Sequence, residues 1–427
     1  MKRSNCIALV PRRCIGSLAI GGLLATLVLS SPAGLADDVV SPAPAASFAP
    51  PGPIAVQPGG SQVLAPPSLT PLLAHEGPLA QWGDVSVRPH LSYRLLYGDG
   101  LQATSGHPTS TTIQEFSPGI LLGLGDHWNL DYTPTWTEYS SKEFRDTLDH
   151  YASLAGGTSY GDWTFGFSQN YISNSPVLVE TGQQTGQELY ATALNTSGHL
   201  GMHTLLDLAV SENVRLADAF TGSRELATSD FLHYQFSERL DAGLGFDAGH
   251  VRESVGPNMD YVRPEARISW KPTDKISISL QGGNEHRHFD SGGAGSMNSP
   301  VYGASVQYQP VETTGLTFGV NRDISVSYIA DEITRNSGWT AGVQQRLLKE
   351  FYLNATFTHG TTGYVATQTG VGGGRDDRTD ALTVRLTTTL FRRGSAAILY
   401  DLSHNTSNVS TYRFSSHQVG LELGFRF

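Results

Sequence analysis

The chain has 427 residues, of which 39% are hydrophobic and 16% are charged. Its 28 basic and 39 acidic residues give a formal net charge of −11, so nucleic acid is not an expected partner, because proteins that bind it present basic surfaces. Both cysteines of the chain lie in its first 36 residues, which are predicted below to be removed, so no disulfide framework and no thiolate metal site are expected; no metal and no cofactor are predicted.

The first 36 residues have the pattern of a secretory signal peptide. Basic residues precede the apolar run 15–29, and small residues precede a cleavage site after Ala36. The run has about 15 residues, fewer than the ~20 that a membrane-spanning helix needs. Cys6 and Cys14 both lie in this signal. Cleavage would remove four basic and no acidic residues, leaving a cysteine-free chain with a formal charge of −15.

Residues 37–82 are predicted to be a disordered, Pro-rich periplasmic linker. Residues 37–80 contain ten of the 22 prolines in the chain. Proline fixes φ and cannot donate a hydrogen bond to a β-ladder, so this arm is expected to be extended and to lack a core.

Residues 83–427 are predicted to form one domain of alternating strands. In the segment that starts at Trp128, for example, Trp128, Leu130 and Tyr132 alternate with Asn129 and Asp131. The second row of each such segment is polar or glycine, which the core of a β-sandwich would not tolerate, because buried polar groups need partners. A polar inner face and an apolar outer face are typical of an antiparallel transmembrane β-barrel, an all-β fold.

Short turns and longer polar loops separate these strands in alternation. The short turns are expected at 125–127, 160–162, 201–203, 237–239, 271–274, 312–315, 348–350 and 392–394. The longer loops are expected at 101–111, 140–147, 177–187, 220–225, 254–260, 291–299, 330–337 and 367–377. Eight short turns need sixteen strands, and one more strand at each end gives about eighteen; sixteen is the alternative. Barrels of this kind keep short turns in the periplasm and longer loops outside.

The closing stretch 417–427 also alternates between apolar residues and polar residues or glycine, and its apolar row ends in Phe425 and Phe427. This predicts a last strand with one face toward lipid and an aromatic residue at the membrane interface. Pairing of the last strand with the first would leave no free strand edge in the lipid.

The signal, the Gly- and aromatic-rich alternation and the ending Leu-Gly-Phe-Arg-Phe resemble bacterial outer-membrane β-barrels, and most closely the "putative β-barrel porin" families. The resemblance covers residues 85–427. It implies an outer-membrane location and recognition of the terminal strand, with Phe425 and Phe427 as the assembly signal, by the barrel-assembly machinery. Some members of these families accompany polysaccharide export systems, so partners from such a system are a further expectation.

Three motifs resemble a catalytic nucleophile, a metal site and a phosphate or calcium loop, but each is better explained as an ordinary turn or loop. Residues 157–161 match G-x-S-x-G, but a strand rather than a helix follows, so a hairpin turn is predicted instead of a nucleophile. His286, His288 and Asp290 could bind a metal, but they sit where a strand runs into a loop, where solvated histidine is commoner. The glycine- and aspartate-rich stretch 372–380 lacks P-loop and calcium-loop spacing and is predicted to be an outer loop, where a divalent ion would bridge to lipopolysaccharide phosphates.

Charged residues in the polar rows are the candidates for function. They are predicted to line a water-filled lumen and set its electric field, although they could instead only solvate the lumen or pair with one another. These residues are Asp131, Asp207, Asp241, Asp247, Arg385, Glu422 and Arg426.

A barrel of 16–18 strands encloses an aqueous channel unless a loop or plug fills it. The leading hypothesis is therefore a porin-like channel for passive diffusion of small polar solutes, with a weak preference for cations. The alternatives are a dedicated export or uptake barrel, for polysaccharide for example, and a structural barrel with an occluded lumen. A soluble β-propeller is the competing fold, and no catalytic set supports an enzyme. Expected partners are outer-membrane lipid, lipopolysaccharide and small polar solutes.

Overall fold

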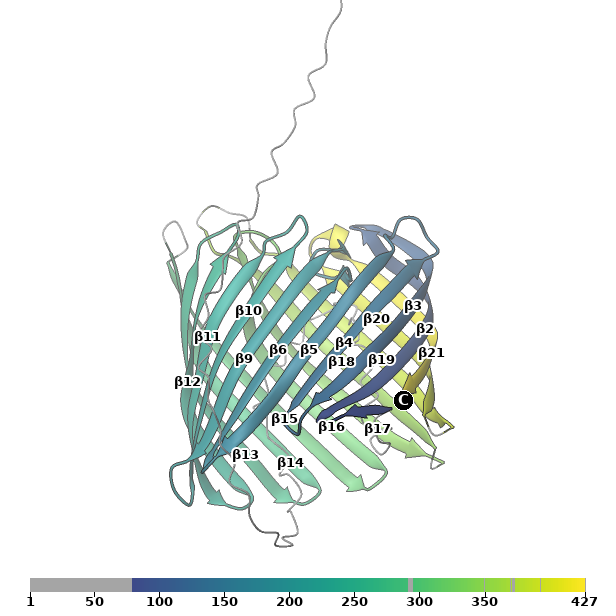
Figure 1. The fold of residues 1–427 in the computed structure, drawn as a ribbon. Coiled ribbons are helices and arrows are strands. Elements are labelled where there is room, and N and C mark those ends of the chain that lie inside the picture. The colour runs from purple at the N-terminus through teal and green to yellow at the C-terminus, as the bar shows by residue number, and fades with distance from the viewer. Residues whose placement is uncertain are drawn as a thin grey trace, which may run out of the picture. The chain divides into compact units, whose positions relative to one another are not determined.

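The computed structural model describes residues 79–290, 295–348, 350–368, 370, 373–391 and 393–426. The predicted signal peptide, the linker up to residue 78 and Phe427 lie outside these residues. Eighteen long antiparallel strands run side by side and close into a barrel (Figure 1). The count of eighteen is confirmed, and the alternative of sixteen is not.

The strands of the wall are β2 (Val85–Thr104), β3 (His107–Leu124), β4 (Trp128–Tyr139), β5 (Thr147–Tyr160), β6 (Trp163–Asn174), β9 (Gln187–His199), β10 (Thr204–Ala217), β11 (Ser223–Ser237), β12 (Leu240–Glu253), β13 (Met259–Thr273), β14 (Ile276–Phe289), β15 (Ser296–Val311), β16 (Thr314–Val326), β17 (Glu332–Leu347), β18 (Phe351–Ala366), β19 (Asp376–Leu390), β20 (Gly394–Ser407) and β21 (Phe414–Arg426). The short elements are β1 (Ala80–Trp82), β7 (Val177–Leu178), β8 (Gln183–Gln184) and the 3₁₀ turn η1 (Ser410–Tyr412).

In the part of the chain that the structure describes, no helix is long and apolar enough to cross a membrane.

The barrel closes where β2 meets β21. Ten residue pairs join these strands, from His90 opposite Arg426 to Asp99 opposite His417, while the other edge of β2 pairs with β3. No edge of the wall is left at this seam, as the sequence predicted. A closed ladder satisfies the backbone hydrogen bonds that lipid cannot.

The eight predicted short turns all join neighbouring strands of the wall, but several strands begin inside the predicted longer loops. β11 begins at Ser223, β15 at Ser296 and β17 at Glu332. The predicted loop 101–111 is mostly strand, and its turn is only Ser105 and Gly106. Gly106 has a φ of 79°, which glycine adopts without strain and which such a tight turn requires. The strand region also begins earlier than residue 83, because β1 pairs with β2. Residues 80–82 contain no proline, so their backbone can pair.

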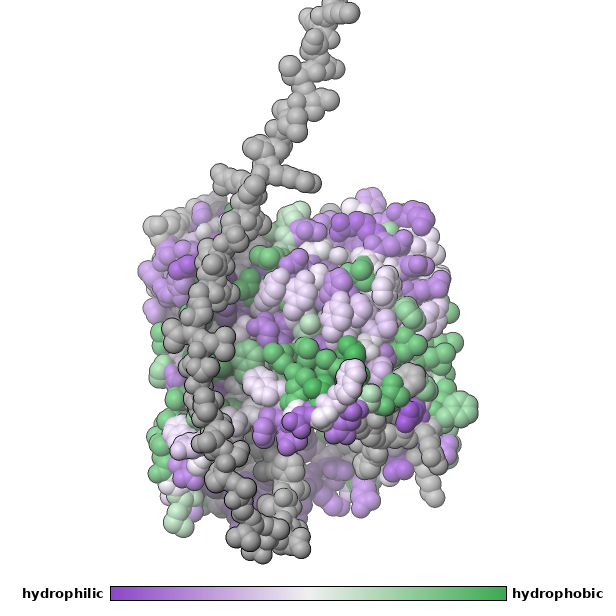
Figure 2. Space-filling view, viewed as in Figure 1, coloured by the Kyte–Doolittle hydropathy of each residue, from purple (hydrophilic) through white to green (hydrophobic). Residues whose placement is uncertain are grey.

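The two faces of the wall carry different residues. Along β21, Leu421 and Leu423 are exposed on the outer face, whereas Glu422 between them is buried on the inner face. Figure 2 shows apolar side chains gathered on the visible outer face, with polar side chains toward the rim. This alternation is the pattern of a barrel that is surrounded by lipid.

Placing a charge on the outer row tests this assignment. Leu423→Arg is expected to lower the free energy of unfolding by about 2–4 kcal/mol if residue 423 lies near the middle of the membrane. Ser415→Arg changes an exposed residue of the same outward row near the far end of β21, where the cost should be about 0–1 kcal/mol. The folded fraction of both variants in liposomes decides the matter; equal losses would mean that residue 423 does not face lipid.

Candidate functional site: the lumen and its mouth

The candidate charges lie in the inward rows of their strands, but the structure gathers them into separate groups instead of one ring. Arg385 and Glu422 meet at the closing seam. Asp247 lies on the opposite wall, since β12 and β13 are about half the strand order away from β2 and β21. Asp131, Asp207 and Asp241 are associated with histidines, and Arg426 lies within electrostatic reach of Asp131.

The group at the seam is a buried ion network. Glu422 is 2% exposed. Its carboxylate accepts hydrogen bonds from the Arg94 Nη2, at 3.1 Å, and from the Arg385 Nη1, at 3.2 Å. The Arg94 Nη1 also donates to Glu115 at 2.9 Å. The expectation that a charge at position 422 would meet water is therefore wrong, because two arginines cover the carboxylate.

A second network lies on β12, β13 and β14. The Arg263 guanidinium is 2.6 Å from a carboxylate oxygen of Asp247, 2.7 Å from Glu265 and 3.7 Å from Glu285. The guanidinium carbon of Arg267 lies 3.4 Å from the centre of the Phe231 ring, which is a cation–π contact. Asp247 is likewise buried, so it pairs with Arg263 and is not a freely solvated pore charge.

Three of the candidate carboxylates retain contact with the lumen. The side chains of Asp131, Asp207 and Asp241 are 39%, 35% and 33% exposed. Asp207 and Asp241 both approach the His233 ring, at 3.4 and 2.8 Å, while Asp131 lies 3.9 Å from His90. These three residues are the best placed of the predicted set to act on a passing ion.

The loop between β6 and β9, residues 175–186, extends to the far side of the barrel; we call it the mouth loop. The Glu180 carboxylate accepts hydrogen bonds from the Ser327 hydroxyl, at 2.5 Å, and from the Tyr328 backbone N–H, at 2.7 Å. Those residues connect β16 to β17, which lie eight strands from β6 and β9 in the wall order. The mouth loop thus crosses the end of the barrel opposite the short turns.

Other loops hold the mouth loop in place. The Arg375 guanidinium, just before β19, donates to the carbonyl oxygens of Glu180, at 2.7 Å, and Val179, at 3.2 Å. The Gln184 side chain exchanges two hydrogen bonds with the backbone of Arg145, between β4 and β5. Burial of Glu180 raises the pKa of its carboxyl above the usual range, despite the hydrogen bond from Ser327 and the nearby Arg215 and Arg375.

The end of the β16–β17 hairpin also leans into the barrel. Among the described residues, Tyr302 and Arg322 are the last pair that joins β15 to β16 toward the mouth. Ile333 belongs to the outward row of β17, yet it is fully buried and packs in one cluster with Val251, Met259 and Phe289. A residue of the outer row can contact these inward-facing residues only if its hairpin passes inside them. The mouth is therefore narrowed by two segments that are bonded to each other.

Sequence reasoning missed these mouth residues, although one signal was present. The predicted polar loop 177–187 begins with Val177, Leu178 and Val179, and Leu178 and Val179 are buried. Loops that run over a surface are usually polar, so an apolar start indicates a loop that packs against something. Nothing local identifies Ser327 and Tyr328 as what it packs against.

The structure shows where two of the other sequence motifs lie, residues 157–161 and the histidines near the end of β14. Ser159 lies in β5 and pairs with Thr164 of β6, so residues 157–161 end a strand and begin a hairpin turn, as predicted. The His286 ring contacts the Asn298 side chain at 2.9 Å. Within the described ranges, no three His, Cys, Asp or Glu side chains are grouped closely enough to hold a metal ion.

Comparison with known proteins gives one family and several solved structures. The model of the family described as "Putative beta-barrel porin 2" matches residues 260–427, and no curated protein matches the chain. Similar solved structures from Pseudomonas aeruginosa include OccK2 (OpdF), 13% identical with a TM-score of 0.46. Others are the outer membrane protein opdK, 13% identical with a TM-score of 0.42, and OpdL, 12% identical with a TM-score of 0.42. Each match covers 80% of this chain and 98% of the other; at these TM-scores the likeness carries no argument about solutes.

Proposed function

We propose that this outer-membrane β-barrel protein, which resembles the "putative β-barrel porin" families, is a channel through which small polar solutes diffuse passively. The observation that carries the proposal is a closed wall of eighteen strands whose inner face bears exposed carboxylates. Barrels of 16–18 strands are wide enough for an aqueous channel. The mouth loop and the β16–β17 hairpin would form the narrow point of this channel, where solutes are selected by size.

The three exposed luminal aspartates are expected to favour cations. Changing Asp131, Asp207 and Asp241 together to asparagine should lower the cation-to-anion permeability ratio by roughly twofold, because fixed charges beside a pore attract counter-ions. The reversal potential across a salt gradient measures this ratio. Asp126→Asn, at an exposed turn, is the matched control and should leave the ratio unchanged. An unaltered ratio in the triple variant would show that these three residues do not determine the ion preference of the pore.

We further propose that the eight short turns face the periplasm and that the mouth faces the outside. Barrels of this class have short periplasmic turns and longer outer loops. Since both cysteines lie in the predicted signal, a single introduced cysteine can be labelled selectively. An impermeant maleimide added to intact cells should label Ser410→Cys, in η1, and should not label Asp126→Cys. The reverse result would invert the orientation.

We keep the predicted signal at residues 1–36, and recognition of the last strand by the assembly machinery through Phe425 and Phe427. The linker was predicted to be residues 37–82, and we now end it at residue 79 because Ala80–Trp82 forms β1. Phe425 lies on the outer row, where a binding partner could reach it, while Phe427 lies outside the described residues. The proposal assigns no enzymatic activity. Export partners and an occluded lumen belong to the alternative functions, which no further observation favours.

A further inference from the structure

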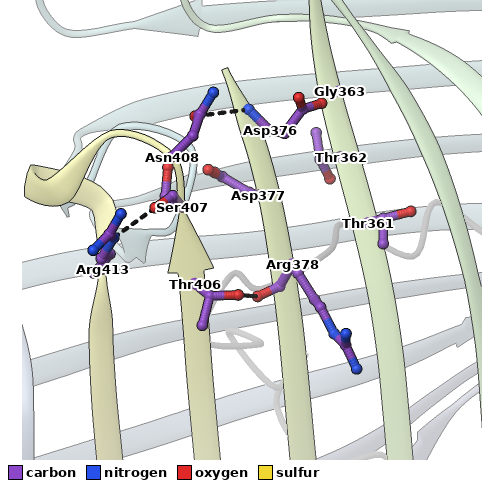
Figure 3. A pocket seen from close by; sticks show the side chains of 10 residues that line it. All are labelled: Thr361, Thr362, Gly363, Asp376, Asp377, Arg378, Thr406, Ser407, Asn408 and Arg413. Carbon is purple, nitrogen blue, oxygen red and sulfur yellow. Dashed lines mark hydrogen bonds between the residues drawn. The ribbon is translucent and has the colours of Figure 1, made fainter. Parts of the chain in front are cut away.

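A polar trough lies on the outer wall of the barrel near the mouth. It has a volume of about 580 Å³ and runs across three neighbouring strands (Figure 3). Its two rims are formed by outward rows of residues. The lower rim is Thr361, Arg378 and Thr406, and the upper rim is Gly363, Asp376 and Asn408. The same outward rows continue toward the short turns as the lipid-facing residues Phe357, Leu382, Leu402 and Ile398.

The trough therefore lies just above the apolar band. One row of paired residues separates the two, and in this row the His359 Nδ1 lies 2.6 Å from a carboxylate oxygen of Asp380. Trp339, the neighbour of His359 in the same row, is an exposed aromatic residue. Aromatic residues gather where lipid tails meet headgroups. This places the trough at the level of the headgroups.

Two guanidinium groups border the trough. The Arg378 side chain is 64% exposed, and its closest carboxylate is that of Asp380, at 4.0 Å. Asp380 also lies 2.6 Å from the His359 ring, so its carboxylate is shared between the two side chains, and its contact with Arg378 is long. Arg413 lies at the side, where its Nε donates to the Ser407 carbonyl oxygen at 2.5 Å. Asp376 is the carboxylate of the upper rim, on the side away from the lipid, where it lies over Gly363.

Arg224, an outward arginine elsewhere on the wall, is placed differently. Arg224 of β11 is also exposed near the mouth, but its Nη2 is 2.5 Å from the Glu212 carboxylate. A close carboxylate occupies the guanidinium and cancels its charge. Arg224 thus offers a matched control, because it has the same side chain in a similar outward position with its partner already present.

We propose that the trough binds the phosphorylated sugar headgroup of lipopolysaccharide. Guanidinium groups bind phosphate through paired charge-assisted hydrogen bonds. Thr361 and Thr406 place hydroxyl groups on the rim for sugar hydroxyls. The acyl chains of the same lipid would continue along the apolar rows below. This inference rests on the proposed orientation, which puts the mouth end in the outer leaflet.

Native mass spectrometry of the purified, refolded barrel tests the site without any use of conduction. Bisphosphorylated lipid A is the probe, with dephosphorylated lipid A and inorganic phosphate at the same concentration as the comparison ligands. The wild type should retain bisphosphorylated lipid A and bind the other two at least about tenfold more weakly, because binding needs both the phosphate and the acyl chains.

The variants identify the residues. Arg378→Gln should weaken retention of lipid A by roughly tenfold, the loss expected for a charge-assisted hydrogen bond, and Arg413→Gln should also weaken it. Arg224→Gln should match the wild type. A heat-modifiable band on a gel shows that each variant is folded. Equal retention by Arg378→Gln and the wild type would overturn the proposal, as would equal retention of phosphorylated and dephosphorylated lipid A. Equally tight binding of inorganic phosphate would exclude a lipid site.

Discussion

Replacing Glu422 with alanine should lower the free energy of unfolding by about 3–5 kcal/mol, the cost of breaking a buried ion pair on one side. Arg94 and Arg385 would both lose their shared carboxylate. Arg94 lies directly opposite Glu422 across the closing seam, so the loss falls where the first and last strands must join. Equilibrium unfolding in liposomes, followed on an unheated gel, measures the change.

Gln418→Ala is the control for this experiment. It shortens another inward side chain of β21, four residues earlier, and no ion pair is lost. Its effect should be within about 1 kcal/mol. If Glu422→Ala cost no more than Gln418→Ala, the seam network would contribute nothing to closure, and position 422 would behave as a solvated lumen residue. On the structure we expect Glu422→Ala to cost at least as much as Leu423→Arg.

Releasing the mouth loop should increase single-channel conductance by about twofold or more, because the narrowest section of a pore dominates its resistance. Changing Glu180 and Arg375 together to alanine removes the bonds from this loop to Ser327 and Tyr328 and those that Arg375 donates to its backbone. Planar-bilayer recording of the folded variant measures the effect.

The control for the mouth loop is Glu143→Ala, which removes an exposed acidic residue from the β4–β5 loop at the same end of the barrel. Its conductance should equal that of the wild type. A double variant that conducts like the wild type would show that the mouth loop does not limit passage, and the narrow point would then have to be sought among the luminal networks.

The wall could be predicted from the sequence because its signals are local. Alternation such as Leu421, Glu422, Leu423 records which side faces lipid, and short turns such as 125–127 separate the strands. The length of the loop predicted at 101–111 was overestimated. β2 and β3 are joined by a two-residue turn at Ser105 and Gly106, so these polar strands extend beyond the membrane.

The site was predicted only in part, because its contacts join distant residues. Alternation placed Asp131 and Glu422 on the inner face, but it could not distinguish an exposed carboxylate from a buried one. Glu422 is buried by Arg94, 328 residues away in the chain. Glu180 and Ser327 are 147 residues apart, so no sequence period relates them. Pairing of this kind depends on strand order and on which loops lean inward.

The most direct test of a diffusion channel is single-channel recording of the refolded wild-type barrel beside the Glu180→Ala, Arg375→Ala variant. A polar lumen that is narrowed at its mouth predicts discrete conductance steps from the wild type and larger steps from the variant. If both proteins were folded, inserted and silent across the voltage range, the lumen would be closed to ions, and the barrel would not be a channel.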